Sequence, residues 1–282
     1  MSLKVIPDPS SMQVQTRKWC LGQKTIGFVP TMGALHEGHL QLVRLSKKAN
    51  DVTVVSIYVN PLQFGPREDF KEYPRTFETD FNLLKKEKIN LLFTPGDKVM
   101  YPEGFSSKVT VSGPLVQGLC APYRPGHFDG VATVVVKLLE AVQPTRLYLG
   151  QKDAQQAILL RQVIQDFNLP VETVICPIVR EQDGLALSSR NTRLTPEGRR
   201  AAPIIYRALK VGKSFFDLGE TRTKKVLGEI QKVLREEKRL KLQYLEAVET
   251  QRLQPVEKLK SGTLLALAAF IDDVRLIDNI IL

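Results

Sequence analysis

The feature of this sequence that most constrains its fold is a run of mostly β-branched and apolar residues at 52–59, V-T-V-V-S-I-Y-V. The run does not alternate between apolar and polar residues, so a strand formed here would be buried on both faces. Strands of that kind are typical of parallel sheets, because the connecting helices cover both faces. The run therefore predicts a buried strand of an α/β domain.

Strand-like and helix-like segments alternate along the first part of the chain. Short β-prone segments predict strands at 25–29, 52–59, 90–94, 146–149 and 171–179. Segments with a helical pattern lie at 39–49, 77–88, 129–142 and 154–167. This β-α-β-α order predicts a parallel sheet with helices on both faces.

The pattern changes after Arg190. Two charged amphipathic helices and two short strands are expected there, at 196–216, 221–238, 242–249 and 263–271. That combination is typical of a small α+β domain. We place the boundary near 176–180, which gives a first domain at 1–177 and a second at 178–282.

Net charge, cysteine spacing and the length of apolar runs limit the classes of protein to which this chain can belong. The chain has 40 Lys and Arg against 30 Asp and Glu, a net charge of +10, which indicates anionic partners such as nucleic acid, an acidic membrane surface or phosphorylated small molecules. Cys20, Cys120 and Cys176 lie far apart with no C-x-x-C pair, so neither a zinc ribbon nor a disulfide framework is indicated. The N-terminus shows no apolar signal core, and the apolar run at 264–271 is too short to span a bilayer. We therefore expect a cytoplasmic protein in a reducing compartment.

The segment at 30–39, P-T-M-G-A-L-H-E-G-H, leaves a predicted strand and enters a predicted helix. Ligands of open α/β sheets bind beyond the carboxyl ends of the strands, and a helix N-terminus favours an anion. Gly33 and Gly38 would let the backbone approach a phosphate closely. His36 and His39 are three residues apart, which puts both imidazoles on one side of the first helical turn.

The two histidines are the centre of a phosphate-handling hypothesis. Their N–H groups could stabilise charge that develops on phosphoryl oxygens. The alternative is that they only cap or pack the helix, but the chain has three histidines and two of them lie in this turn. A metal site at the pair has no carboxylate or cysteine at ligand spacing to support it, so we expect no protein metal site here.

Two further segments follow predicted strands. In N-P-L-Q-F-G at 60–65, Gln63 offers a donor and an acceptor suited to a hydroxy acid, although the segment could be an ordinary turn. In G-Q-K-D-A-Q-Q at 150–156, Lys152 would place a point charge near a phosphate. Asp153 could accept from a ribose hydroxyl or act as an N-cap, and Gln156 would share its helix face.

Three further positions in the sequence are candidates for contacts with a ligand or a metal ion. S-S-R-N at 188–191 combines two hydroxyls with a guanidinium that can bind phosphate bidentately, or it is a solvent-exposed loop. His127, in the segment R-P-G-H-F-D-G, is either a site residue or a helix-entry residue. Asp80 is a candidate magnesium ligand on a predicted helix.

Taken together these segments resemble the pantothenate synthetases, the pantoate–β-alanine ligases. The stretches that carry the resemblance are V-P-T-M-G-A-L-H-E-G-H-L at 29–40, Y-V-N-P-L-Q-F-G at 58–65, R-P-G-H-F-D-G-V at 124–131, G-Q-K-D-A-Q-Q at 150–156, V-R-E-Q-D-G-L-A-L-S-S-R-N at 179–191 and R-L-I-D-N at 275–279. An H-x-G-H motif alone is weak, because other nucleotidyl-transferring enzymes contain it. The first five of these motifs occur in order along nearly the whole chain and are together highly specific, and R-L-I-D-N at 275–279 matches as well.

The resemblance implies an α/β fold with a Rossmann-like parallel-sheet nucleotide-binding domain and a smaller α+β C-terminal domain that folds over ATP. It implies a homodimer that uses ATP and Mg²⁺. In the family reaction, the pantoate carboxylate attacks the α-phosphorus of ATP to give pantoyl adenylate and pyrophosphate. β-Alanine then attacks the acyl carbon and releases AMP and pantothenate.

The resemblance also implies roles for individual residues. His39 would be the proton donor. Because attack at phosphorus is catalysed mainly by positioning and charge neutralisation, His36, His39, Lys152 and Arg190 could supply a cation-rich clamp without a protein nucleophile. Gln63 and Gln156 would bind pantoate. The ATP site would comprise Met32, Gly33, Ala34, Leu35, His36, Glu37, Gly38, His39, Gly150, Gln151, Lys152, Asp153, Val179, Leu187, Ser188, Ser189 and Arg190.

Rival functions require features that this sequence lacks. A nucleotidyltransferase acting on a phosphorylated substrate would need basic residues where Gln63 and Gln156 stand. A synthetase that charges tRNA would need an anticodon-binding region and a K-M-S-K-S-like loop. A nucleic-acid-binding protein would show clustered basic residues with exposed aromatics, yet aromatics make up only 7% of the chain. We therefore expect neither a nucleic-acid nor a membrane partner.

Overall fold

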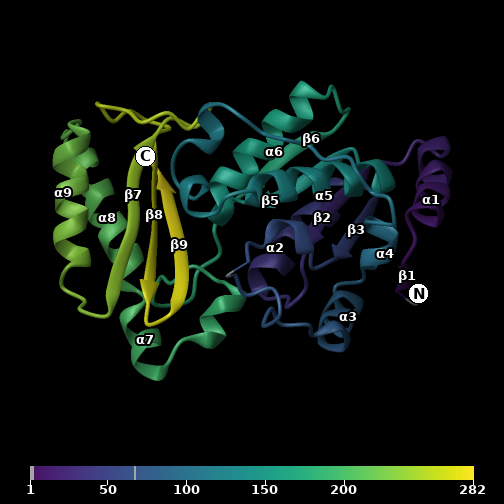
Figure 1. The fold of residues 1–282 in the computed structure, drawn as a ribbon, viewed down its shortest axis with the longest axis horizontal. Coiled ribbons are helices and arrows are strands. Elements are labelled where there is room, and N and C mark those ends of the chain that lie inside the picture. Colours follow the sequence, from purple (N-terminus) through teal and green to yellow (C-terminus); the bar gives the residue numbers. More distant parts are fainter. Residues whose placement is uncertain (1–2, 67) are drawn as a thin grey trace. The chain divides into compact units, whose positions relative to one another are not determined.

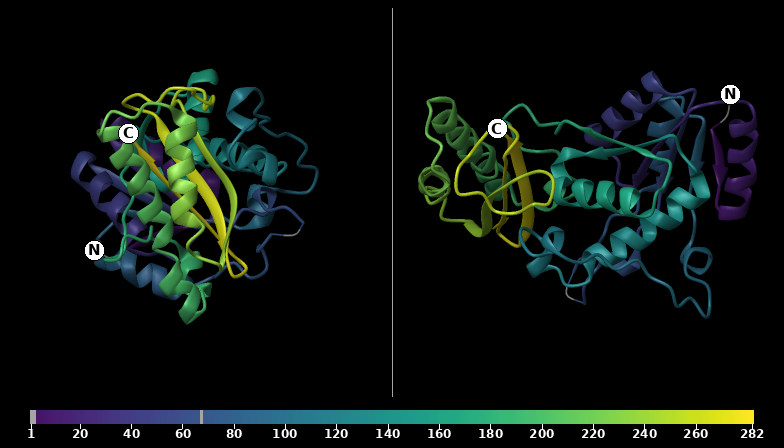
Figure 2. Two further views of the ribbon diagram at one scale, coloured as in Figure 1. Left: turned by 90° about the vertical axis from the view of Figure 1, so that its left-hand side faces the viewer. Right: turned by 90° about the horizontal axis from the view of Figure 1, so that it is seen from above.

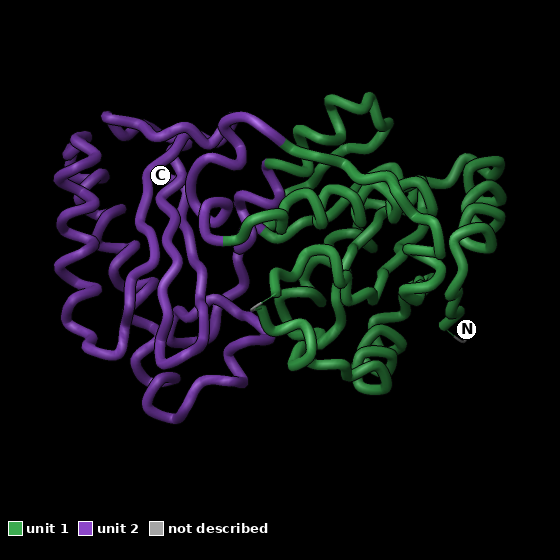
Figure 3. The backbone as a smooth tube through the Cα atoms, in the orientation of Figure 1, with its two compact units in different colours: residues 1–111, 124–150, 159–176 green, residues 112–123, 151–158, 177–282 purple. Residues whose placement is uncertain are grey.

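The computed structural model describes residues 3–66 and 68–282. The chain divides into two compact units, coloured separately in Figure 3, and each is described by itself. The first unit consists of residues 1–111, 124–150 and 159–176, and the second of residues 112–123, 151–158 and 177–282.

Within the described residues, the first unit contains a sheet of six strands in the order β1-β4-β3-β2-β5-β6 (Figure 1). The strands are β1 (Lys4–Ile6), β2 (Ile26–Thr31), β3 (Val52–Ile57), β4 (Leu91–Phe93), β5 (Arg146–Gly150) and β6 (Glu172–Cys176). All neighbouring pairs are parallel. The β-prone run at 52–59 forms β3, and Val54 and Val55 on its opposite faces are both fully buried. The predicted α/β class with a parallel sheet is confirmed.

One face of this sheet is covered by α2 (Glu37–Ala49) and α3 (Phe77–Lys86). Val43 of α2 and Leu84 of α3 pack with Val55 of β3 in one buried core. Because α2 and α3 follow β2 and β3 in turn, both crossovers run in the same direction across the sheet and cover the same face.

The opposite face takes the other helices, α1 (Pro9–Leu21), α5 (His127–Val142) and α6 (Ala154–Asp166). Their connections run the other way across the sheet, so right-handed crossovers place them on the second face. The buried Oγ1 of Thr16 in α1 donates to the carbonyl oxygen of Val142 in α5 at 3.0 Å. Helices therefore cover both faces, as the sequence pattern predicts.

Short helical turns complete the connections. Over residues 3–66 and 68–282 they are the single turn α4 and five 3₁₀ turns: α4 (Asp97–Met100), η1 (Pro61–Gln63), η2 (Pro114–Val116), η3 (Ala121–Tyr123), η4 (Gln151–Asp153) and η5 (Ser189–Arg193). In the described part of the chain, no helix has both the length and the apolar character needed to cross a membrane.

The second unit contains an antiparallel sheet of β7, β8 and β9, with helices α8 and α9 along one face (Figure 2). Its elements are α7 (Pro196–Ala201), α8 (Ile204–Asp217), α9 (Thr223–Leu234), β7 (Leu240–Val248), β8 (Leu264–Ile271) and β9 (Val274–Ile281). Leu209 of α8, Ile230 of α9 and Leu265 of β8 are completely buried in a common core. This is the small α+β arrangement that the sequence predicts.

The second unit differs from the sequence prediction in one helix and in one additional strand. The single helix expected at 196–216 is two helices, because Pro203 has no N–H to continue the hydrogen-bond ladder between α7 and α8. Strand β9 was not expected, since Arg275 and Asp278 interrupt its apolar pattern. Asp278 is nevertheless buried, and Arg180 neutralises it through two hydrogen bonds.

Helices α8 and α9 offer a matched pair of glycines for a stability test. A Cβ at Gly212 of α8 would lie 2.4 Å from Ile230 Cδ1, whereas a Cβ at Gly228 of α9 would meet nothing within 4 Å. We expect Gly212→Ala to destabilise the protein by about 1–3 kcal/mol through overpacking. Gly228→Ala should stabilise it by up to ~1 kcal/mol through helix propensity. Shifts of the thermal unfolding midpoint in opposite directions are the expected result, and shifts of the same sign would contradict it.

Candidate active site

The turn between β2 and α2 carries the two neighbouring histidines of the first unit. His36 is the N-cap of α2, and its Nδ1 accepts a hydrogen bond from the backbone N–H of Gly38 at 3.1 Å. His39 Nδ1 accepts in turn from the backbone N–H of His36 at 3.4 Å. The two ring centroids are 4.1 Å apart, so the imidazoles lie on one side of the turn, as their spacing predicts. Capping is therefore one of their roles.

These bonds assign a tautomer to each ring. A ring nitrogen that accepts a hydrogen bond carries no proton, so the proton of neutral His36 and of neutral His39 lies on Nε2. Both side chains thus have their N–H donor on the atom that lies outside the capping bonds. This pattern fits donation to an anion by neutral imidazoles.

The backbone N–H groups of the same turn are largely used inside the protein. Gly33 donates to Thr31 Oγ1, and His36 and Gly38 donate to the histidine rings. Fewer backbone N–H groups than the sequence predicts are therefore available in this turn to bind a phosphate. The imidazole Nε2–H groups are the stronger candidates for the contact with an anion.

Asp80 of α3 fixes the shape of this turn. Its carboxylate is 1% exposed and accepts from the backbone N–H groups of Ala34 at 2.9 Å and Leu35 at 2.8 Å. Thr76 Oγ1 donates to the same carboxylate at 3.2 Å. Ala34 has φ +50°, a left-handed conformation that costs free energy for a residue with a side chain, and the bonds to Asp80 offset that cost. Asp80 therefore holds the turn, which is a different role from the magnesium ligand considered from the sequence.

Gln63, at the end of η1, lies in the same unit with its carboxamide held on both sides. Its Oε1 accepts from Asn60 Nδ2 at 3.1 Å, and its Nε2 donates to Met32 Sδ at 3.1 Å. Asn60 is also fixed, because Tyr101 O–H donates to its Oδ1 at 2.7 Å. The structure thus brings together Met32 and Gln63, which the sequence analysis had selected from two separate motifs.

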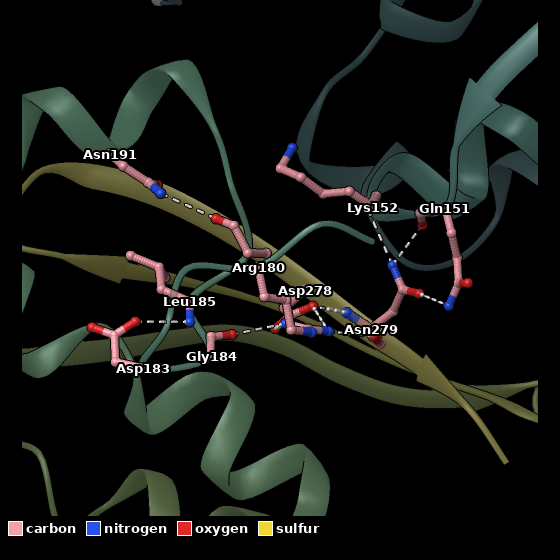
Figure 4. A network of polar contacts seen from close by, with 10 residues as sticks. Gln151, Lys152, Arg180, Asp183, Gly184, Leu185, Asn191, Asp278 and Asn279 are labelled. Atoms are coloured by element: carbon pink, nitrogen blue, oxygen red, sulfur yellow. Dashed lines mark hydrogen bonds and ion pairs between the residues drawn. The ribbon is translucent and has the colours of Figure 1, made fainter. Parts of the chain in front are cut away.

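The second unit contains the predicted residues at 151–156 and 179–190, whereas Gly150 ends β5 in the first unit. Asn279 of β9 holds the turn at 151–153, because its Nδ2 donates to the carbonyl oxygens of Gln151 at 2.9 Å and Lys152 at 3.1 Å. Gln151 Nε2 donates back to Asn279 Oδ1 at 3.2 Å. Figure 4 shows the Lys152 side chain extending away from this amide cluster. Lys152 Nζ is 3.4 Å from Asp153 Oδ2, so the two predicted residues form an ion pair.

The loop at 179–191 is held by backbone pairing. Leu187 N–H donates to the carbonyl oxygen of Val179 at 3.0 Å, which brings these two predicted residues side by side. Ser188 Oγ accepts from the backbone N–H of Arg190 at 3.3 Å and caps η5, where Ser189 is the first residue. Asn191 Nδ2 donates to the carbonyl oxygen of Ala186 at 3.1 Å.

A buried ion pair supports the same loop. Arg180 contacts both carboxylate oxygens of Asp278, at 2.7 Å and 2.9 Å, and also donates to the carbonyl oxygen of Gly184 at 3.1 Å (Figure 4). Burial raises the pKa of Asp278, and the Arg180 guanidinium opposes that shift. The bidentate geometry fixes Arg180, and through it the start of the loop.

The two neighbouring glutamines of α6 differ in their environment. Gln155 is buried, and it accepts from the Cys120 N–H at 2.8 Å and donates to the carbonyl oxygen of Leu115 at 2.9 Å. Gln156 is half-buried, and its amide makes no hydrogen bond to another described residue. Gln155 therefore has a structural role, whereas Gln156 remains suited to a ligand, as the sequence analysis proposed.

The sequence did not identify three residues that hold the candidate site in shape. Asn60 and Asn279 lie inside the motifs N-P-L-Q-F-G and R-L-I-D-N, so the motifs contained the signal although the side chains were not selected. Asp80 has no such motif, and only its burial reveals its role. Among the described residues, no group of three or more His, Cys, Asp or Glu side chains could hold a metal ion.

Comparisons with known proteins agree with this geometry. The family model described as pantoate-beta-alanine ligase matches residues 4–281. Pantothenate synthetase from Caldicellulosiruptor saccharolyticus is 51% identical over 258 residues, which cover 92% of each chain. Pantothenate synthetase from Thermotoga petrophila is 48% identical over 280 residues, which cover 99% of this chain and 100% of the other.

Solved structures give the same result. Pantothenate synthetase from Thermus thermophilus superposes with a TM-score of 0.93 at 42% identity and covers 99% of both chains. The pantoate-beta-alanine ligase from Francisella tularensis, complexed with beta-gamma ATP and beta-alanine, has a TM-score of 0.81 at 34% identity, with 99% of this chain and 97% of that chain covered. On its sequence, its fold and the arrangement of its motif segments, this chain belongs to the pantoate–β-alanine ligase family.

Proposed function

We propose that this chain condenses (R)-pantoate with β-alanine in an ATP-dependent reaction that passes through pantoyl adenylate. The proposal is supported by a family match over residues 4–281 and by a related ligase whose structure holds an ATP species and β-alanine. The observation that carries it is the pair His36 and His39 at the start of α2, where the Nδ1 atom of each ring accepts a backbone N–H.

In the first step, a pantoate carboxylate oxygen attacks the α-phosphorus of ATP. The bond to the bridging oxygen of the β-phosphate breaks, and pyrophosphate leaves with the electron pair. In the second step, the β-alanine amine attacks the acyl carbon, AMP leaves and the amine loses a proton. The first step needs no proton and no protein nucleophile, so positioning and charge stabilisation carry the catalysis.

The histidines supply that stabilisation in our proposal. The Nε2–H groups of His36 and His39 donate hydrogen bonds to the phosphoryl oxygens as negative charge develops. Proton transfer from His39 would leave an imidazolate anion, because its Nδ1 already lacks a proton. His39 therefore acts as a hydrogen-bond donor in this mechanism, in place of the proton transfer that the family resemblance implies.

The remaining roles follow the family resemblance. Gln63 and Gln156 bind pantoate, and Lys152 and Arg190 supply positive charge to the phosphates. Hydrogen bonds fix Gln63 and the turn that carries Lys152, which supports contacts to the substrates that are preorganised before binding. ATP contacts are proposed for the residues 32–39, 150–153, Val179 and 187–190.

Mg²⁺ is proposed to arrive with ATP. Mg²⁺ commonly binds through substrate phosphates and water with only one or two carboxylates. The donor set here fits that mode, because Asp80 is already occupied by backbone N–H groups and the described residues form no larger ligand cluster. When bound, the ion would neutralise phosphate charge.

The assembly and location remain proposals as well. We propose a homodimer in which each chain has a first domain at 1–177 and a smaller domain at 178–282 that closes on the nucleotide. A cytoplasmic location is supported by Cys20, Cys120 and Cys176, which are free thiols in the structure.

Product analysis tests the reaction. With ATP and Mg²⁺, we expect pyrophosphate release to require pantoate, and AMP and pantothenate to appear only when β-alanine is added. Chromatography of the nucleotides and an enzymatic pyrophosphate assay measure the two steps. ATP cleavage without pantoate would refute the proposed function.

The role of His39 is tested by His39→Asn. The Asn side-chain oxygen can replace Nδ1 as the capping acceptor, but no donor then reaches the position of Nε2. We expect kcat for adenylate formation to fall by about 10²–10³-fold, with the ATP KM and the melting temperature nearly unchanged. A rise in ATP KM as large as the fall in kcat would show that His39 serves ground-state binding instead.

The role of Asp80 is tested by Asp80→Asn, with Glu78→Gln as the matched control. The new amide would point a donor at the N–H of Ala34 or Leu35, so we expect a loss of about 1–3 kcal/mol in stability and of at least tenfold in kcat/KM for ATP. Glu78 is exposed on the same helix, and its substitution should change neither quantity. Equal effects of the two variants would rule out a specific role for Asp80.

A further inference from the structure

We propose that His127 is a positioning residue that holds Gln63 in place for pantoate, through a chain of contacts that begins at Glu68 and passes through Arg124. The proposal rests on the proposed function, since it takes Gln63 to bind pantoate. It gives a role to the third histidine, which the sequence analysis left open between a site residue and a helix-entry residue.

His127 is the first residue of α5 and is only 6% exposed. Its Nε2 lies 2.9 Å from Arg124 Nη1, and its Nδ1 lies 2.7 Å from the carbonyl oxygen of Gln63. A guanidinium can only donate, so Nε2 is the acceptor and carries no proton. The proton of the neutral ring is therefore on Nδ1, which donates to the Gln63 carbonyl. This tautomer is the opposite of the one assigned to His36 and His39.

Arg124 is itself held in one orientation. Its Nε and Nη2 contact the two carboxylate oxygens of Glu68 at 2.7 Å and 2.6 Å, which is bidentate geometry. Burial alone would raise the pKa of Glu68, but the hydrogen bonds and charge of Arg124 hold that pKa below its usual value. Glu68 is therefore ionised near neutral pH, and the contacts from Glu68 to Gln63 form one continuous chain.

The side chain and the main chain of Gln63 are fixed from different sides. Asn60 holds the carboxamide, and the same Asn60 Nδ2 also donates to the carbonyl oxygen of Gly130 in α5 at 3.1 Å. A Cβ at Gly130 would lie 2.2 Å from the carbonyl oxygen of Leu62 and 2.7 Å from the Gln63 nitrogen, so α5 packs directly on η1. His127 adds the one directional bond from α5 to the Gln63 main chain among these contacts.

The consequence for the reaction follows from the position of Gln63. A shift of about 1 Å in a substrate-positioning group can lower activity by about a hundredfold. Without the bond from His127, the Gln63 carbonyl is left buried without that donor, and the turn can move relative to Met32 and Asn60. The effect should fall mainly on pantoate, because the chain of contacts ends at Gln63, whereas Asp80 holds the turn with His36 and His39 separately.

Two substitutions separate the two nitrogens of His127. In His127→Asn, the amide nitrogen can stand where Nδ1 stood and still donate to the Gln63 carbonyl. In His127→Gln, the longer side chain reaches the position of Nε2 and leaves the carbonyl without its donor. We expect His127→Gln to raise the pantoate KM about tenfold or more with the ATP KM within about twofold, and His127→Asn to remain closer to the parent enzyme.

Thr133→Val is the matched control on the same helix. Thr133 is buried, and its Oγ1 accepts from the Val109 N–H at 2.9 Å, away from Gln63. It should lower the melting temperature and leave the pantoate KM unchanged. If both His127 variants fail to fold, Glu68→Gln tests the same chain from its other end, and it should raise the pantoate KM in the same direction.

A double-mutant cycle with Gln63→Ala decides the outcome. If His127 acts through Gln63, the variant with both Gln63→Ala and His127→Gln has the same kcat/KM for pantoate as Gln63→Ala alone. An unchanged pantoate KM in Gln63→Ala would overturn the proposed role of Gln63 itself. Two outcomes would overturn the positioning role while leaving the proposed function intact, given that Gln63→Ala raises the pantoate KM. In the first, the effects of Gln63→Ala and His127→Gln on kcat/KM are independent and multiply in the double variant. In the second, neither His127→Gln nor Glu68→Gln changes the pantoate KM.

Discussion

The hydrogen bonds between the Asp80 carboxylate and the backbone of the β2–α2 turn are the contacts on which the histidine site depends. A buried carboxylate is costly unless donors surround it, and Ala34 and Leu35 provide two of them. In return, the carboxylate keeps Ala34 in a left-handed conformation that sets where α2 begins. The orientation of His36 and His39 follows, because both rings cap that helix start.

The same arrangement recurs around the other proposed ligand contacts. Asn60 holds the side chain of Gln63, and Asn279 holds the backbone of the 151–153 turn. Both asparagines are themselves fixed by hydrogen bonds. Each uses its amide as donor and acceptor at once, which rigidifies a turn without a large core. Three of the groups proposed to meet substrates, His36, Gln63 and Lys152, therefore sit on short turns whose shape is set by an asparagine or aspartate.

The sequence predicted the sheet and the histidine pair well, because both depend on local spacing. The unbroken apolar run at 52–59 identifies a strand buried on two faces, and an i, i+3 spacing fixes which side of a helix two rings share. The sequence could not show which ring nitrogen of His36 and His39 carries the proton, since that depends on contacts with the backbone. Nor could it separate Asp80 from an exposed acid such as Glu78, because both occupy the first turn of α3 and differ only in burial. Pro203 marks the break between α7 and α8, but the amphipathic pattern runs across it and favours a single helix.

The dependence of the β2–α2 turn on Asp80 also bears on how the protein folds. Asp80 lies 46 residues beyond Ala34 and is reached only after β3 and the long connection to α3. A nascent chain that ends before residue 80 contains both histidines but not the carboxylate that shapes their turn. Since such long-range contacts form only after the loop between them has closed, the β2–α2 turn is completed by tertiary docking and not by local sequence. The part of the molecule that looks most like a short linear motif is thus a product of long-range assembly.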